Sequence, residues 1–134
     1  MAKYVFPVIL TLEKEGGYYA KFPDLESCYT QGDDLTDALD MAKDVLELML
    51  YGYEIKKKII PNPSDIKSFK LNENQIASLV TADTIEYRKL YDNKSVNKTV
   101  TLPAWLNTLA EEAEINFSGL LQLALKEQLH IDSQ

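Results

Sequence analysis

The sequence contains very few of the residues that build metal sites and covalent catalysts. Among its 134 residues there is one cysteine, Cys28, and one histidine, His130. A single cysteine permits neither an internal disulfide nor a cysteine-based metal site. No histidine lies near Cys28 in the sequence to activate it as a nucleophile. We therefore expect no bound metal, no cofactor and no cysteine-dependent catalysis.

Long apolar runs are also absent. No stretch approaches the ~20 apolar residues that a membrane-spanning helix requires, and residues 1–7 carry no secretory cleavage pattern. Hydrophobic residues nevertheless make up 46% of the chain and aromatic residues 10%, which is too much for a disordered chain. These features predict a folded cytoplasmic protein with no membrane partner.

Positive charge is scarce, with 14 lysines and arginines against 21 acidic residues and a net charge of −7. Between residues 24 and 54, Lys43 is the only base. A solvated helix face explains part of this acidity. A basic partner protein explains it equally well, because complementary charge raises the association rate and fixes the orientation of binding. The acids in this stretch are Asp24, Glu26, Asp33, Asp34, Asp37, Asp40, Asp44, Glu47 and Glu54.

The start of the chain has the alternating pattern of β-strands. Residues 4–12 and 18–22 flank a turn that contains Gly16-Gly17, which predicts a hairpin. Pro7 indicates that the first strand lies at a sheet edge or carries a bulge. Residues 27–31 predict a short third strand.

A long helix and a mixed segment follow. Asp34 is a predicted N-cap, and apolar residues recur after it at helical spacing as far as Gly52, where we expect the helix to end. Residues 66–71 suggest a marginal extended piece and residues 75–82 a further strand. The segment 83–91 opens with a capping-box pattern and predicts a short helix.

The polar, turn-prone stretch of residues 92–95 indicates a domain boundary. We therefore predict a first domain over residues 1–91, a linker over residues 92–95 and a second domain over residues 96–134.

Residues 96–129 have the pattern of one strand and two helices. Residues 96–102 alternate, Pro103 ends the strand, apolar residues recur at helical spacing from Leu106, and Ser118 is expected to cap the second helix. A unit of this size cannot bury a core alone, and its strand has no partner within the unit. We therefore predict that two copies pair these strands about a twofold axis, with four helices beneath them.

This arrangement resembles a ribbon-helix-helix unit, whose paired strands enter the major groove of DNA. Polar side chains on the exposed face of the ribbon would contact base edges, and the amides that open the second helix would hold a phosphate. Few basic residues lie in this region, so a module that only dimerises is the alternative. The predicted DNA-binding residues are Asn97, Thr99, Thr101, Asn116, Phe117 and Ser118.

Short motifs along nearly the whole chain resemble those of the HicB-type antitoxins. Each motif is short, but their order and spacing together are specific. In chain order they are Gly16-Gly17-Tyr18, Phe22-Pro23-Asp24-Leu25, Cys28, Gln31-Gly32-Asp33, Ala38-Leu39, Ile60-Pro61, Asp83 with Tyr87-Arg88, Asn97 with Val100-Thr101-Leu102-Pro103-Ala104-Trp105-Leu106, and Asn116-Phe117-Ser118.

The resemblance implies an α+β fold. A small N-terminal sheet with one packed main helix would be partially RNase H-like, and a C-terminal ribbon-helix-helix module would form the dimer. It implies an antitoxin, not an enzyme, that masks the active site of a HicA-type mRNA endoribonuclease and binds the operator DNA of its own operon as a homodimer or tetramer. We expect this basic toxin to meet the acidic residues Asp24, Asp33, Asp37 and Asp40.

Two other functions remain as alternatives. One is a metal-dependent, RNase H-like nuclease with a DNA-binding tail, which would need several converging carboxylates. Its candidates are Asp24, Asp33, Asp34 and Asp83, although turns and helix caps already explain most of them. The other is a solitary transcriptional regulator without a toxin partner.

Overall fold

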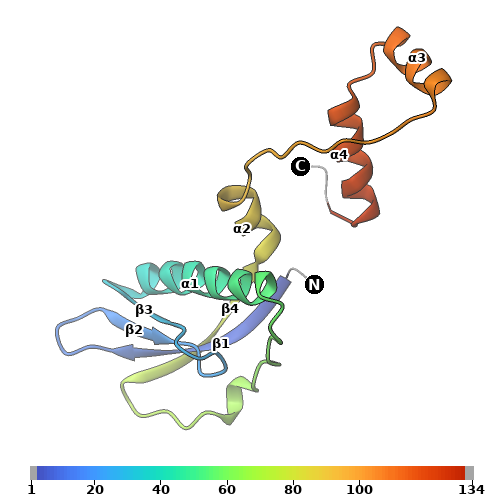
Figure 1. Ribbon diagram of the computed structural model, residues 1–134. Helices are drawn as coiled ribbons and strands as arrows, with labels where there is room; N and C mark the ends of the chain where they lie inside the picture. The colour runs from blue at the N-terminus through green and yellow to red at the C-terminus, as the bar shows by residue number, and fades with distance from the viewer. Residues whose placement is uncertain (1–2, 132–134) are drawn as a thin grey trace. The chain divides into compact units, whose positions relative to one another are not determined.

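The computed structural model describes residues 3–131 and divides the chain into two compact units, residues 1–94 and 95–134. Figure 1 shows the first unit as a sheet covered by a long helix and the second as a helix pair. Within the described residues, no helix is both long enough and apolar enough to cross a membrane. The two units are described separately below.

The first unit is built on a four-stranded antiparallel sheet in the order β3-β2-β1-β4. The predicted hairpin is confirmed, with β1 and β2 joined through glycines that have positive φ angles. The fourth strand pairs with β1 along most of its length. The strands are β1 (Lys3–Leu12), β2 (Tyr18–Lys21), β3 (Tyr29–Gly32) and β4 (Gln75–Asp83).

The position expected for Pro7 is only partly correct. Strand β1 lies inside the sheet, between β2 and β4. However, β2 pairs only with residues 9–12 of β1, whereas Pro7 is opposite Leu79 of β4 and has no strand on its other side. A proline lacks the amide that a second neighbour would require, so it is tolerated at this half-edge.

Helix α1 (Leu35–Ile55) covers one face of the sheet. Its predicted N-cap is confirmed, because the side chain of Asp34 accepts a hydrogen bond from the amide of Asp37. The predicted end at Gly52 is wrong, since the helix continues to Ile55. A glycine lowers helix stability only by about 1 kcal/mol, and the flanking residues Leu50 and Tyr53 pack on the core and offset that cost.

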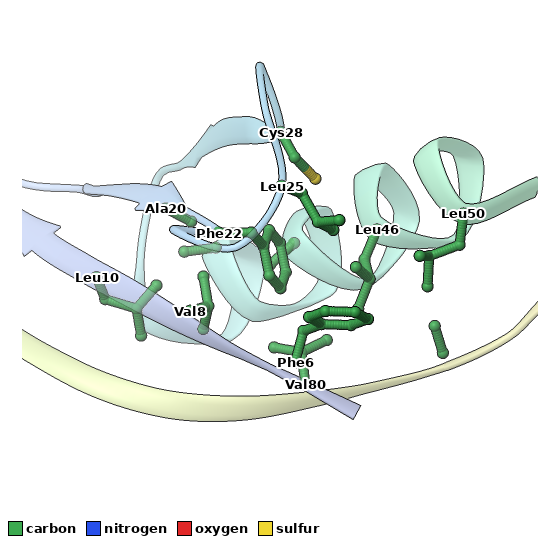
Figure 2. Packing of buried hydrophobic residues seen from close by; sticks show 13 residues of the cluster. Phe6, Val8, Leu10, Ala20, Phe22, Leu25, Cys28, Leu46, Leu50 and Val80 are labelled. Atoms are coloured by element: carbon green, nitrogen blue, oxygen red, sulfur yellow. The ribbon is translucent and has the colours of Figure 1, made fainter. Parts of the chain in front are cut away.

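The core of the first unit lies between the sheet and α1. In Figure 2 the rings of Phe6 and Phe22 lie beside Leu46 of the helix. Full burial of such side chains contributes roughly 1.5–3 kcal/mol each. The buried hydrophobic residues are Phe6, Val8, Leu10, Ala20, Phe22, Leu25, Cys28, Ala38, Ala42, Leu46, Leu50, Val80 and Ala82.

The connection from α1 to β4 contains only one short element. The extended piece expected over residues 66–71 is wrong, because Ile66–Ser68 forms a 3-10 turn, η1, which Asp65 caps through the amide of Lys67. After β4, helix α2 (Thr84–Tyr91) begins as predicted, with Asp83 as its N-cap.

The second unit contains helices α3 (Ala104–Glu112) and α4 (Phe117–Gln128). The strand expected over residues 96–102 is absent from the single chain, where residues 93–103 have no regular structure. A strand is defined by its ladder, and this segment has no partner within one copy. The predicted cap at Ser118 is wrong, because Asn116 caps α4 by accepting a hydrogen bond from the Gly119 amide at 3.1 Å.

Candidate partner-binding surfaces

The exposed face of α1 carries a row of carboxylates that we call the α1 acidic strip: Asp37, Asp40, Asp44 and Glu47. They follow one another at spacings of three and four residues and therefore lie along one side of the helix. Lys43 is the only base on this helix, and its Nζ lies 3.9 Å from Glu47 Oε2. The strip thus offers a negative surface to a basic partner.

Two of the predicted toxin-binding carboxylates stand at the start of α1. The amide of Asp33 donates to Asp37 Oδ2 at 2.8 Å, while the amide of Asp37 donates to Asp34 Oδ1 at 2.8 Å. Asp37 therefore also holds the helix N-terminus. Asp40 follows Asp37 on the strip and is exposed, and within residues 3–131 no hydrogen bond or ion pair involves its side chain.

Asp24 has a different place in the structure. It lies in the loop after β2, where its carboxylate accepts hydrogen bonds from the amide and the hydroxyl of Ser64. These bonds tie the loop to the long connection between α1 and β4. Asp24 therefore has a structural role, and the structure does not link it to the α1 acidic strip.

A groove of about 410 Å³ lies between α1 and α2. Apolar and aromatic side chains line it, including the exposed residues Leu48, Leu90 and Tyr91. Four acidic side chains line it as well, two of them from the α1 acidic strip. The sequence analysis missed this groove, although Leu48 already stood outside the buried apolar stripe of α1. The four acids are Asp44, Glu47, Asp83 and Glu86.

Glu54 joins β1, α1 and α2. Its carboxylate accepts hydrogen bonds from the hydroxyls of Tyr4 and Thr84 at 2.8 Å and from the Arg88 guanidinium at 3.0 Å. Burial alone would raise the pKa of Glu54, but the hydrogen bonds from Tyr4, Arg88 and Thr84 outweigh it and lower the pKa. Burial, together with the bond to this carboxylate, raises the pKa of Tyr4 to about 12.

Aromatic rings continue this junction along α2. Tyr87 stacks against Tyr51 of α1 at 5.1 Å and against Tyr91 at 4.7 Å between ring centroids. The Arg88 guanidinium lies 5.0 Å from the ring of Tyr51, and the Tyr51 hydroxyl donates to Asp92 at 3.0 Å. These contacts hold α2 on α1 and so keep the wall of the groove in place.

The predicted DNA-binding residues lie in two segments of the second unit. Asn97, Thr99 and Thr101 are exposed in the segment without regular structure. At the start of α4, Asn116 uses its side chain as the cap and Ser118 accepts a hydrogen bond from Gln122 at 3.1 Å. Phe117 is 41% exposed there.

No described residue of the second unit is buried. Its large apolar side chains are instead exposed over α3, α4 and the segment before them, which is unusual for a monomer. The exposed residues are Val96, Val100, Leu102, Trp105, Leu106, Leu109, Ile115, Phe117, Leu120, Leu121, Leu123, Leu125 and Leu129.

The carboxylates considered for a nuclease have structural partners. Asp34 and Asp83 cap α1 and α2, and Asp24 binds Ser64. Within residues 3–131, no group of three or more His, Cys, Asp or Glu side chains is placed to hold a metal ion. Cys28 is buried, and burial raises the pKa of its thiol to about 11, which disfavours the reactive thiolate.

A solved structure shares the architecture over nearly the whole chain. One chain of a toxin–antitoxin complex from Streptococcus pneumoniae is 26% identical, has a TM-score of 0.61, and matches over 94% of this chain and 99% of that chain. The antitoxin HicB of Burkholderia pseudomallei, at 16% identity, has a TM-score of 0.54 over 94% of this chain and 98% of its own. The second likeness shows the fold alone.

Sequence comparisons agree with this likeness. The antitoxin HicB of Escherichia coli strain K12 is 38% identical over 63 residues, which are 47% of this chain and 46% of that protein. The chain thus spans about half the length of this curated relative. A sequence model described as a HicB-like antitoxin of bacterial toxin–antitoxin systems matches residues 6–124. The chain therefore belongs to the HicB-like antitoxin family.

Proposed function

We propose that this chain is the antitoxin of a HicA-type mRNA endoribonuclease and masks the active site of that toxin with its first unit. Family membership supports an antitoxin, and the similar Streptococcus chain belongs to a toxin–antitoxin complex. A ribonuclease must attract the phosphates of RNA, so its active-site face is positively charged. That face would meet the α1 acidic strip.

One observation carries this proposal: the α1 acidic strip adjoins an apolar groove, and two strip residues, Asp44 and Glu47, line both. Charged residues guide the encounter and set the orientation, while buried apolar contacts hold the complex. We therefore place the toxin on the exposed side of α1 and on the groove beside α2. Asp24 is excluded from the contact set that we propose, because it binds Ser64.

Charge reversal on α1 tests the proposal. The variant Asp40→Lys with Asp44→Lys should lower the association rate with the toxin by roughly tenfold at low salt, measured by stopped flow. Glu15→Lys with Glu73→Lys changes the net charge equally at exposed acids outside the strip and should have a much smaller effect. Equal losses in both variants would mean that net charge alone drives association and that the strip is not the site.

The second unit supports the other half of the proposal, repression of the chain's own operon. We infer that two copies pair residues 96–102 as a ribbon and bury the exposed apolar side chains of α3 and α4 as a ribbon-helix-helix dimer. Asn97, Thr99 and Thr101 would then face the bases in the major groove. The amides of Phe117 and Ser118 at the start of α4 would lie near a phosphate.

Operator binding tests this part. Asn97→Ala with Thr99→Ala should remove the preference for the operator over unrelated DNA while leaving the oligomer and toxin inhibition intact. Asn93→Ala with Ser95→Ala removes similar polar groups just outside the ribbon and should bind like the unchanged chain. Titration of a labelled promoter fragment measures both. An unchanged preference in the ribbon variant would reduce the module to a dimerisation device.

A further inference from the structure

Strand β4 forms a long open edge of the sheet. It runs over nine residues and pairs only with β1. Natural proteins usually block such edges with lysine, proline or a bulge, because an open edge pairs with strands of other molecules. From Gln75 to Ala82 the strand contains neither lysine nor proline and no charged residue, and its register with β1 is continuous.

Helix α1 protects only one end of this edge. Lys43 Nζ donates to the carbonyl oxygen of Thr81 at 3.3 Å, and the amide of Asp83 donates to Glu47 Oε2 at 3.1 Å. Both contacts come from the side opposite β1, so Thr81 and Asp83 direct their backbone groups outward. The rest of the edge extends beyond these side chains.

The outward direction alternates along a strand. Ala77 and Leu79 therefore share the outward direction of Thr81, whereas Ser78 and Val80 bond toward β1. Within residues 3–131, no hydrogen bond outside the sheet ladder engages the backbone of Ala77 or Leu79. The middle of β4 thus presents unpaired donors and acceptors in the spacing that another strand would require.

The side chains at this edge are apolar and accessible. Leu79 is 54% exposed on the sheet face away from α1, and Ile76 is 48% exposed on the other face. Alternating residues of a strand point to opposite faces, so a strand added here would gain apolar contacts on both sides of the sheet.

We propose that β4 pairs antiparallel with β4 of a second copy of this chain, about a twofold axis at Leu79. In that register Leu79 faces its own counterpart and Ala77 faces Thr81, so every outward group of the open stretch gains a partner. Gln75 would lie opposite Asp83, which places no like charges face to face. Two four-stranded sheets would become one continuous sheet.

Charge favours a second copy as the occupant. A chain with a net charge of −7 repels itself over most of its surface, but β4 is uncharged up to Ala82. This edge is therefore where two copies can approach with the least repulsion. Together with the proposed dimer of the second unit, it would give each chain two different twofold interfaces and close a tetramer.

Removal of one amide tests the pairing in the full chain. Leu79→Pro deletes an outward N–H that the ladder to β1 does not use, and proline is tolerated on edge strands. This variant should lose the larger species in light scattering at concentrations where Leu79→Ala, which keeps the amide, retains at least part of it. Circular dichroism checks that both variants fold. Identical masses for the unchanged chain and Leu79→Pro would overturn the proposal.

A cross-link keeps the proposal testable if the proline variant unfolds. Leu79→Cys places two thiols opposite each other across the axis, within the Cα separation of about 4.4–6.8 Å that a disulfide accepts. Thr81→Cys lies on the same edge and face, yet its two copies would be about 14 Å apart along the strands. Cys28 is buried and should not compete. Mild oxidation should cross-link Leu79→Cys and not Thr81→Cys. Equal cross-linking of both variants, or of neither, would exclude this register.

Discussion

Glu54 shows how a residue that looks like surface charge in the sequence becomes part of the interior. It belongs to the acidic stretch of residues 24–54, yet its side chain is only 19% exposed and serves three donors from two other elements. The donors Tyr4, Thr84 and Arg88 lie 30 to 50 residues away in sequence. Local patterns carry no information on such distant pairing, so the sequence analysis could not separate Glu54 from the α1 acidic strip.

Replacement of Glu54 should reveal this role through its pH dependence. We expect Glu54→Gln to lower the free energy of unfolding by about 1–3 kcal/mol near neutral pH. Because the folded state lowers the pKa of Glu54, its contribution is present above the ordinary value of 4.5 and is lost as the pH falls through the lower, folded-state value. The difference between the two proteins should therefore shrink in urea unfolding below that pH. A difference that grows in acid would contradict the network.

Two glycines make a matched pair of predictions. A Cβ added to Gly32 at the end of β3 would lie 2.2 Å from the backbone nitrogen of Ala38 in α1, whereas one added to Gly52 meets nothing within 4 Å. Gly32→Ala should therefore destabilise the first unit by about 2 kcal/mol or more, since backbone must move. Gly52→Ala should stabilise it by about 0.5–1 kcal/mol, as expected inside a helix. Thermal unfolding measures both, and the same sign of effect would refute this reading of the packing.

At the scale of elements, local signals placed most of the first unit correctly. Alternation located β1, β2 and β4, and side-chain caps located the starts of α1 and α2. The errors arose where distant contacts decide: Gly52 stays inside α1, and Ile66–Ser68 turns into a short 3-10 helix. For partner surfaces the same limit applied, because the groove exists only once α2 lies against α1.

The cap of α4 gives a prediction at this scale. Asn116 satisfies the Gly119 amide, whereas Ser118, the residue first expected to cap, bonds only to the side chain of Gln122. Asn116→Ala should cost about 1 kcal/mol of helix stability, and Ser118→Ala only a few tenths. Hydrogen exchange of the α4 amides in the full chain measures this. A greater loss of protection in Ser118→Ala would restore the original assignment.

At the scale of the whole molecule, the two units differ in what a single copy can bury. The first unit encloses thirteen buried hydrophobic residues between its sheet and α1. The second has no buried residue among those described, so its helices need a partner surface to be stable. The sequence indicated this need through an unpaired strand pattern, and the exposed apolar side chains of α3 and α4 support it.

The aromatic residues happen to report on the two units separately. All eight tyrosines lie in the first unit, whereas the only tryptophan, Trp105, lies on α3 and is 66% exposed in the single chain. If the second unit is stable only as a dimer, its unfolding must depend on protein concentration. Each tenfold increase should add about 1.4 kcal/mol to the free energy of unfolding of the dimer.

We therefore expect the Trp105 fluorescence transition to move to higher temperature as the concentration is raised from about 1 to 100 µM, a range that corresponds to about 2.7 kcal/mol. The experiment is done in the Leu79→Pro background, which removes the pairing proposed for β4. In that background the tyrosine signal of the first unit should be nearly independent of concentration, because its core is complete within one chain. A Trp105 transition at a fixed temperature would mean that α3 and α4 are stable without a second copy, and the ribbon proposed for residues 96–102 would lose its basis.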